Sequence, residues 1–234
     1  MDGKQVCVVV GVGPGNGAAL ARRFAAEGWA VALLARGGAT SDALAARLPD
    51  ARAFACDVTD PDAIERVFDA IAREMGPVRA LLYNADVATW GNVEQVDPAA
   101  LEQSFRVGTL GLLRCAQKVI PGMKALGGGS IIVIGATASR RGVARTAGFA
   151  PAKSGQRALC ESMARHLWPR RIHVALVILD GVVDLPKTRA LMADKPDEFF
   201  LSPDAVAATA FHLATQDPSG WSFEVEARPF GEPW

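Results

Sequence analysis

The sequence predicts an α/β protein built on a doubly wound, seven-stranded parallel sheet with helices on both faces. Three observations support this prediction. Apolar runs of strand length alternate with helical segments, no linker-like stretch divides the 234 residues, and half of them are hydrophobic. Near-continuous apolar strands are typical of parallel sheets, because right-handed crossovers cover both faces with helices. We therefore expect a single domain over residues 1–234.

The N-terminal part of the chain opens this alternation. A β-rich run over residues 5–10 stops at glycines, and apolar residues at helical spacing follow over residues 17–28. The apolar run 31–35 predicts a second strand. A helix over 42–48 and a short third strand over 51–55 complete the first repeats of the pattern.

The middle of the chain repeats the pattern with longer helices. Proline suits the first turn of a helix, so we expect one helix over residues 61–75 and another over 98–122. The apolar runs 78–83 and 130–134 predict buried strands after each of them. Residues 130–134 would then lie beside 78–83 in the sheet.

The C-terminal part supplies the last two strands. A helix over residues 147–167 precedes Pro169, a strand is expected over 172–179, and a helix over 203–215 leads to the strand 222–227. Seven strands thus alternate with six helices. Ligands bind such sheets outside the carboxyl ends of the strands. The candidate site therefore comprises the loops after Val10, Ala35, Tyr83, Ile134 and Leu179.

The composition of the chain limits the kinds of binding partner and the cellular compartment that we expect. Lys plus Arg and Asp plus Glu both number 25, so no overall field attracts nucleic acid or an anionic membrane, and we expect a small-molecule substrate. The four cysteines form no C-x-x-C pair and the three histidines lack ligand spacing, so we expect reduced thiols and no metal. The first apolar run is too short for a signal peptide or membrane span, which predicts a cytoplasmic protein.

A glycine-rich loop lies between the first expected strand and the first expected helix. Gly11, Gly15 and Gly17 have the G-x-x-x-G-x-G spacing, with Asn16 between the last two. Missing side chains let backbone N–H groups approach phosphate oxygens at the positive end of the following helix. A tight turn is the alternative interpretation. The position of the glycine-rich loop between a strand and a helix favours a Rossmann fold that holds the pyrophosphate of a dinucleotide in this loop.

Two further residues concern the adenosine half of such a cofactor. Arg36 follows the second strand, where an acidic residue would accept the ribose hydroxyls of NAD and an arginine would pair with a 2′-phosphate. We therefore expect NADP(H) in preference to NAD(H), a solvated surface arginine being the alternative. Asp57, followed by Val58, would lie near the adenine amine or cap a helix.

Taken together, these residues resemble the short-chain dehydrogenase/reductase family over essentially the whole chain. The resemblance implies NAD(P)-dependent oxidoreduction of a small carbonyl or alcohol, and a homodimer or homotetramer. The matching positions are Gly11, Gly15 and Gly17 of the glycine motif, Asp57 and Val58 at the adenine, Asn84 and Ala85 of the N-A-G turn, Lys153, and Gly181 and Val183 of a later cofactor loop.

The family's catalytic tetrad of Asn, Ser, Tyr and Lys is matched here only at the lysine. Lys153 fits the Y-x-x-x-K motif, where the family uses it at the nicotinamide ribose. Phe149 occupies the tyrosine position, Ala136 the serine position and Gly108 the asparagine position. Loss of general acid–base catalysis costs ~10² to 10⁴-fold in rate, while hydride transfer belongs to the cofactor.

Several residues are candidates for the missing proton donor. Thr137 and Ser139 follow the fifth strand as hydroxyls, and Lys153 would donate if burial lowered its pKa. Asp86 and Asp180 would either exchange a proton or cap the turns that follow them. Two hypotheses result: an NADP(H)-dependent oxidoreductase with a non-standard proton donor, or an inactive NADP(H)-binding pseudo-enzyme that serves as a sensor or scaffold.

Two segments near the C-terminus remain. By its position in the family pattern, the stretch 185–201 resembles a substrate-covering lid. The last residues are too apolar for a free end, so we expect them to pack against the body or a second subunit. Their aromatic residues are Trp221, Phe223, Phe230 and Trp234.

Overall fold

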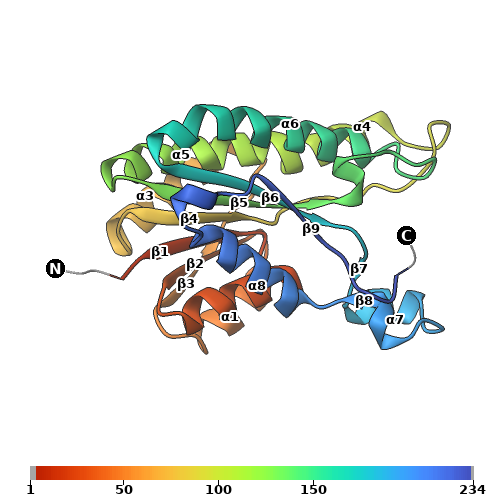
Figure 1. The fold of residues 1–234 in the computed structure, drawn as a ribbon, viewed down its shortest axis with the longest axis horizontal. Coiled ribbons are helices and arrows are strands. Elements are labelled where there is room, and N and C mark those ends of the chain that lie inside the picture. Colours follow the sequence, from red (N-terminus) through yellow and green to blue (C-terminus); the bar gives the residue numbers. More distant parts are fainter. Residues whose placement is uncertain (1–3, 233–234) are drawn as a thin grey trace.

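The computed structural model describes residues 4–232 and forms three layers, a central sheet between two layers of helices (Figure 1). Seven parallel strands form the sheet in the order β3-β2-β1-β4-β5-β6-β9, which confirms the expected doubly wound fold. The strands are β1 (Val6–Val10), β2 (Ala30–Ala35), β3 (Ala51–Ala55), β4 (Val78–Tyr83), β5 (Gly129–Ala136), β6 (Ile172–Leu179) and β9 (Glu224–Ala227).

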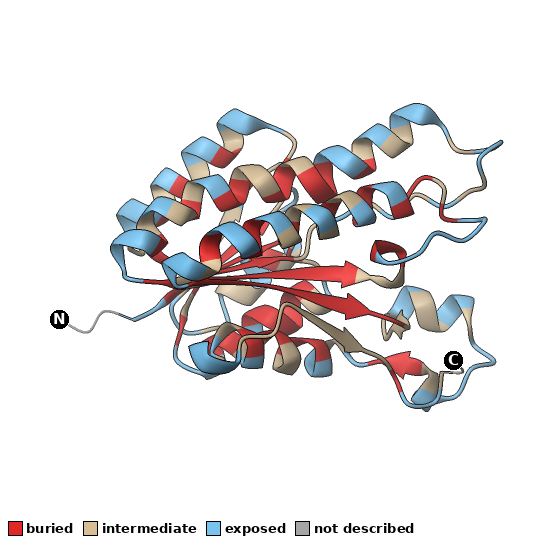
Figure 2. Cartoon of the chain, turned by 45° about the horizontal axis from the view of Figure 1, so that its top comes forward, coloured by how far each residue is buried: buried red, intermediate tan, exposed pale blue. Residues whose placement is uncertain are grey.

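Each face of the sheet is buried beneath its own set of helices. One face packs against α3 (Pro61–Glu74), α5 (Gly111–Ala125) and α6 (Ala150–Leu167). The other packs against α1 (Asn16–Ala26) and α8 (Pro203–Ala214). The inner strands are buried along their length (Figure 2). Burial on both faces explains why these strands read as continuous apolar runs.

Helix starts follow local capping. The carboxylates of Asp60 and Asp97 accept backbone N–H groups at the starts of α3 and α4 (Pro98–Phe105), with a proline in the first turn of each. The expected start at residue 147 is wrong, because Thr146 to Phe149 form a turn and α6 begins at residue 150. The expected helix 42–48 lies instead at α2 (Ala39–Ala45), because Gly38 accepts the Asp42 N–H.

The expected single helix over residues 98–122 is interrupted. A π-helical segment (Arg106–Leu110) separates α4 from α5, and α5 continues to residue 125 with Pro121 inside it. The Tyr83 hydroxyl and the Gln156 amide donate to the carbonyls of Val107 and Gly108, which holds the π segment in place. The helix stops where Gly127 takes a φ of +73°, a backbone conformation that favours glycine.

A second sheet of two short strands lies beside the last helices. It pairs β7 (Val182–Val183) with β8 (Phe200–Leu201), and α7 (Pro186–Leu191) lies between them in the chain. Strands of two residues leave no periodicity in a sequence, so they escaped prediction. With α7 and the divided helix 98–122, the described residues contain eight α-helices rather than six.

The C-terminal aromatic residues differ in their surroundings. The Trp221 ring stacks on His173 with centroids 4.7 Å apart, and Phe223 packs against the core. Phe230 is 90% exposed in the monomer, so it does not pack against the body, and packing against a second subunit stays a prediction. Trp234 lies outside the described residues. The Gly231 N–H donates to the Glu198 carbonyl at 3.2 Å, which joins the tail to the segment 185–201.

Candidate active site

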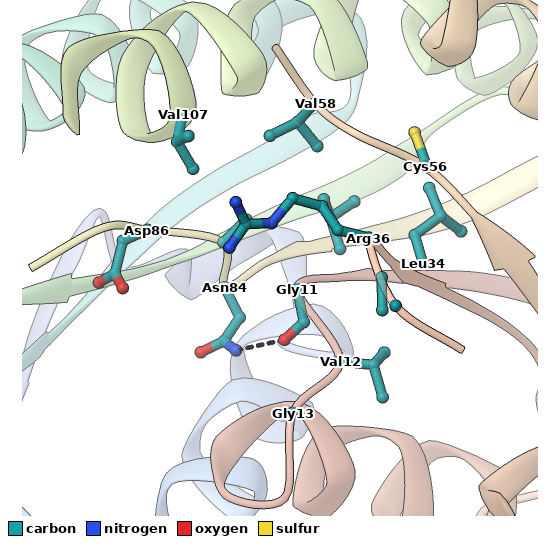
Figure 3. Close-up of a pocket in the computed structure, with 14 residues that line it drawn as sticks. Gly11, Val12, Gly13, Leu34, Arg36, Cys56, Val58, Asn84, Asp86 and Val107 are labelled. Carbon is teal, nitrogen blue, oxygen red and sulfur yellow. Dashed lines mark hydrogen bonds between the residues drawn. The ribbon is translucent and has the colours of Figure 1, made fainter. Parts of the chain in front are cut away.

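A cavity of about 640 Å³ lies at the carboxyl edge of the sheet, where the loops after β1, β2, β3 and β4 meet (Figure 3). Its lining includes Gly11, Arg36, Val58, Asn84 and Asp86. A volume of this size suits an extended organic ligand. Of the loops predicted to form the site, those after Val10, Ala35 and Tyr83 line this cavity, together with the loop after β3, whereas the loops after Ile134 and Leu179 do not.

The glycine loop forms one wall of the cavity by close backbone packing. Gly11 has a φ of +90°, and a Cβ there would lie 2.6 Å from the Ala85 nitrogen. A Cβ at Gly17 would lie 2.5 Å from the Gly11 carbonyl oxygen, whereas one at Gly13 would meet no atom within 4 Å. The Asn84 amide donates to the Gly11 carbonyl at 2.8 Å and braces the loop (Figure 3).

The amino end of α1 is left open toward this loop. Gly15 is the N-cap and contributes no side chain, and the first turn contains no acidic residue. Within residues 4–232, the buried Oδ1 atom of Asn16 has no hydrogen-bond partner. An uncapped helix start carries N–H groups and partial positive charge, both of which suit a phosphate. These residues therefore fit the pyrophosphate of a dinucleotide.

The side of the cavity at the ends of β2 and β3 combines one basic side chain with apolar side chains. The Arg36 side chain points from the end of β2 into the cavity (Figure 3), and no acidic residue directly follows this strand. Asp57 accepts the N–H and hydroxyl of Thr59, both at 2.8 Å, and the backbone hydrogen bond lowers the pKa of this carboxyl. Burial raises the pKa of the Cys56 thiol to about 11, so it stays protonated at neutral pH.

At the other end of the site the Lys153 ammonium is almost fully buried, with two hydrogen bonds and one ion pair. It donates to the Ile134 carbonyl at 3.0 Å and to Gln156 Oε1 at 3.2 Å, and Asp86 Oδ2 lies 3.1 Å away as an ion-pair partner. Gln156 is fully buried and donates its amide to the Gly108 carbonyl at 2.7 Å. These contacts hold the ammonium group in a fixed position. The sequence analysis missed Gln156, three residues after Lys153.

The positions that match the family tetrad do come together around Lys153. Phe149 is the N-cap of α6, and its ring centroid lies 5.7 Å from Lys153 Nζ. Ala136, at the end of β5, packs against the small apolar cluster that contains Phe149. Gly108 lies in the π segment and is joined to Lys153 through Gln156.

The two hydroxyl candidates are already engaged. Thr137 donates to the carboxylate of Asp180, which also forms an ion pair with Arg228. Burial would raise the pKa of Asp180, but the hydrogen bonds from Arg228 and Thr137 outweigh it and lower this pKa overall. Ser139 is buried, and its hydroxyl oxygen accepts the Ala136 N–H at 3.1 Å.

The only tyrosine does not reach the cavity. Tyr83 is fully buried and donates its hydroxyl to the Val107 carbonyl beneath the π segment. Burial raises the pKa of this phenol well above its ordinary value. Tyr83 is therefore a poor candidate for a replacement proton donor.

The segment after β6 closes over the glycine loop. Val183 lies in β7, and its carbonyl accepts the Thr188 hydroxyl at 2.6 Å. A Cβ at Gly181 would lie 2.6 Å from Pro229 Cδ, so the C-terminal tail packs directly on this glycine. The Leu185 side chain contacts Gly15, which brings the segment 185–201 against the glycine loop.

Metal clusters, disulfides and membrane-spanning helices are absent from the described part of the chain. No cluster of three or more His, Cys, Asp or Glu side chains there is placed to hold a metal ion. The four cysteines are buried and unpaired. No helix within residues 4–232 is both long and apolar enough to cross a bilayer.

Comparison with known proteins assigns the chain to a family. The family model described as short chain dehydrogenase matches residues 5–195. The 3-oxoacyl-acyl-carrier-protein reductase MabA of Mycobacterium bovis is 30% identical over 220 residues, which are 91% of this chain and 86% of that protein. The D-xylose 1-dehydrogenase of Caulobacter vibrioides is 31% identical over 231 residues, 94% of this chain and 91% of that protein.

Solved structures agree over nearly the full length. A short-chain dehydrogenase from Rhodopseudomonas palustris superposes with a TM-score of 0.83 at 30% identity, covering 97% of this chain and 99% of that one. A metagenomic short-chain oxidoreductase in complex with NADP gives a TM-score of 0.82 at 28% identity, covering 98% and 99%. This chain is therefore a member of the short-chain dehydrogenase family and has its Rossmann fold.

Proposed function

We propose that this chain is an NADP(H)-dependent oxidoreductase that interconverts a small carbonyl compound and its alcohol. The proposal rests on one cavity that is lined both by the glycine loop, which suits a phosphate group, and by Asp86. Asp86 in turn contacts the buried Lys153. When bound, the nicotinamide accepts or supplies hydride at the substrate carbon. The protein's own residues bind and orient the two partners.

The choice of NADP(H) over NAD(H) rests on Arg36. Its guanidinium extends into the cavity, where it would pair with a 2′-phosphate, and no carboxylate follows β2 to accept ribose hydroxyls. A relative with 28% identity binds NADP, which supports the choice.

The cofactor-holding residues divide into two groups. The glycine loop and the amino end of α1 would hold the pyrophosphate, and Lys153 would hold the nicotinamide ribose as the family resemblance implies. The full proposed set is Gly11, Gly15, Asn16, Gly17, Arg36, Asp57, Val58, Asn84, Ala85, Lys153, Gly181 and Val183.

The proton must travel by a route unlike the usual one. Phe149, Ala136 and Gly108 bring no hydroxyl or amide side chain to the tetrad positions. Two hydrogen bonds and the ion pair with Asp86 hold Lys153 in place, so we assign it to positioning. Thr137 and Ser139 face Asp180 and Ala136, and each would have to leave this partner to reach a substrate.

The first experiment is turnover of NADPH against a panel of carbonyl compounds. The panel includes 3-oxoacyl thioesters, and with NADP⁺ it includes D-xylose and D-threitol, because relatives are named for these substrates. We expect NADPH absorbance to fall with at least one carbonyl compound, faster than in a Lys153→Ala control. Tight NADP(H) binding by calorimetry without any turnover would refute oxidoreduction and indicate a binding protein.

Two properties of the whole molecule belong to the same proposal. We propose a homodimer or homotetramer, as the family resemblance implies, and a cytoplasmic location, consistent with four unpaired cysteines. Light scattering of the purified protein measures the first, and fractionation of the source cells measures the second.

A further inference from the structure

Asp86 is the one ionisable side chain that both contacts Lys153 and lines the cavity within the described residues. Its Oδ2 atom lies 3.1 Å from Lys153 Nζ, and its carboxylate is 41% exposed while the ammonium is 3% exposed. Figure 3 places this carboxylate at the end of the cavity remote from Cys56 and Leu34. One side of Asp86 therefore meets a fixed positive charge, and another is open to ligand and solvent.

No turn uses this carboxylate as a cap. Within residues 4–232, neither a backbone N–H nor a hydroxyl donates to Asp86, whereas Asp57 and Asp60 accept backbone N–H groups in the usual way. A capping role was the alternative that the sequence left open for Asp86. Its contact with Lys153 favours the chemical role instead.

The remaining proton-bearing groups of the site are committed to other partners. The Tyr83 hydroxyl donates to a buried carbonyl, and the Thr137 hydroxyl donates to Asp180. Ser139 is buried within the turn that follows β5, and its hydroxyl oxygen accepts the Ala136 N–H. Lys153 donates to the Ile134 carbonyl and to Gln156 Oε1, which keep its charge in place beside Asp86.

The wall next to this pair is aromatic. The Phe149 ring lies 5.7 Å from Lys153 Nζ, and the half-exposed Trp90 ring packs on it at a centroid distance of 5.7 Å. The Phe149 ring next to the pair carries no exchangeable proton. A carbonyl or alcohol oxygen beside Phe149 would therefore have Asp86 as its nearest proton partner.

We propose that Asp86 is the catalytic acid and base of this site, with Lys153 as its fixed counter-ion. The inference rests on the proposed function, since it assigns the proton step of that reaction. In alcohol oxidation the carbon gives hydride to NADP⁺, and the O–H electron pair becomes the second C–O bond. The Asp86 carboxylate takes the proton and releases it to solvent. In reduction the protonated carboxyl returns that proton to the carbonyl oxygen.

The test replaces Asp86 with asparagine and with glycine. An asparagine carbonyl has the same shape and can still lie beside the Lys153 ammonium, so Asp86→Asn removes proton exchange and keeps a polar contact. The control is Glu94→Gln, which removes the same charge from an exposed side chain in the same loop. With the substrate found in the panel, we expect kcat of Asp86→Asn to fall ~10² to 10⁴-fold. NADPH affinity by fluorescence should stay within about threefold of wild type, a free-energy difference below 1 kcal/mol.

Chemical rescue separates a proton carrier from a structural carboxylate. Formate added to Asp86→Gly should restore part of the lost kcat, whereas chloride at the same ionic strength should not. Undiminished kcat in Asp86→Asn, or a loss in Asp86→Gly that formate does not reverse, would overturn the assignment and leave the proposed function standing. Absence of turnover by the wild-type protein on the whole panel would overturn both.

Discussion

Replacing Gln156 with methionine tests how the buried end of the site is held together. Gln156 is fully buried on α6, accepts from Lys153 at 3.2 Å and donates to the Gly108 carbonyl at 2.7 Å. Methionine has a similar length and no hydrogen-bonding amide, so the change removes both contacts with little change in volume.

The two lost contacts set the size of the effect. A buried carbonyl that loses its partner costs about 1–3 kcal/mol, and a hydrogen bond to a charged group contributes about 1.5–3 kcal/mol. Gly108 also sits in the π segment, which the Gln156 amide helps to hold against α6. Because contacts within one network are not additive, we expect Gln156→Met to lower the free energy of unfolding by about 2–4 kcal/mol.

Urea denaturation measures this difference if the m-value is unchanged. The control is Gln117→Met on α5, an exposed helical glutamine with no hydrogen bond found in the described residues, which should change stability by less than about 0.5 kcal/mol. NADP(H) affinity should fall in Gln156→Met because Lys153 loses one of its two hydrogen-bond acceptors. A Gln156→Met protein as stable as Gln117→Met would show that the network contributes nothing, and the reasoning would be refuted.

Three further predictions concern other parts of the site. Arg36→Leu should weaken NADP⁺ binding by roughly 10-fold or more in calorimetry and leave NAD⁺ binding nearly unchanged, and equal losses for both cofactors would contradict its assigned role. Gly11→Ala should lower the free energy of unfolding by more than about 1 kcal/mol in urea denaturation, because Gly11 has a φ of +90° and a Cβ there would meet the Ala85 backbone. Gly13→Ala is the control and should be tolerated, because a Cβ at Gly13 meets open space. Similar urea midpoints for the two variants would refute this prediction. The pKa of Asp180 is lowered in the folded protein, so this carboxylate stabilises the fold above its ordinary pKa of 3.8 and the stabilisation is lost as the pH falls further. The free energy of unfolding of Asp180→Asn should therefore fall less steeply with acid than that of wild type. Equal slopes of this free energy against pH in the acid range would exclude the effect.

The fold could be predicted because its signals are local. The five inner strands of the main sheet are mostly apolar runs, and each strand is separated from the next by a helix-length segment. The π segment could not be foreseen, because its carbonyls are held by Tyr83 and Gln156, which lie 24 and 48 residues away in the chain. The two-residue strands β7 and β8 depend on pairing across the segment between them and carry no pattern of their own.

The same distinction separates the two ends of the candidate site. The glycine loop lies within seven consecutive residues, so its spacing and its place between a strand and a helix could be read from the sequence and favoured phosphate binding. The surroundings of Lys153 come from four separate elements: the loop after β4, the π segment, β5 and α6. No spacing in the sequence reports that these elements meet at one ammonium group.

Three residues that differ from the family pattern, Phe149, Ala136 and Asp86, lie around the same lysine in the structure. Phe149 and Ala136, at positions where the family resemblance implies hydroxyl groups, pack in one small apolar cluster, so this wall of the site is apolar. Asp86, which the resemblance aligns with the glycine of the N-A-G turn, brings a carboxylate to the ammonium that those positions surround. A random loss of catalytic groups would not be expected to add a charged partner at the same lysine. We therefore infer that these substitutions are linked, and a Phe149→Tyr, Asp86→Gly double variant with more activity than Asp86→Gly alone would demonstrate that link.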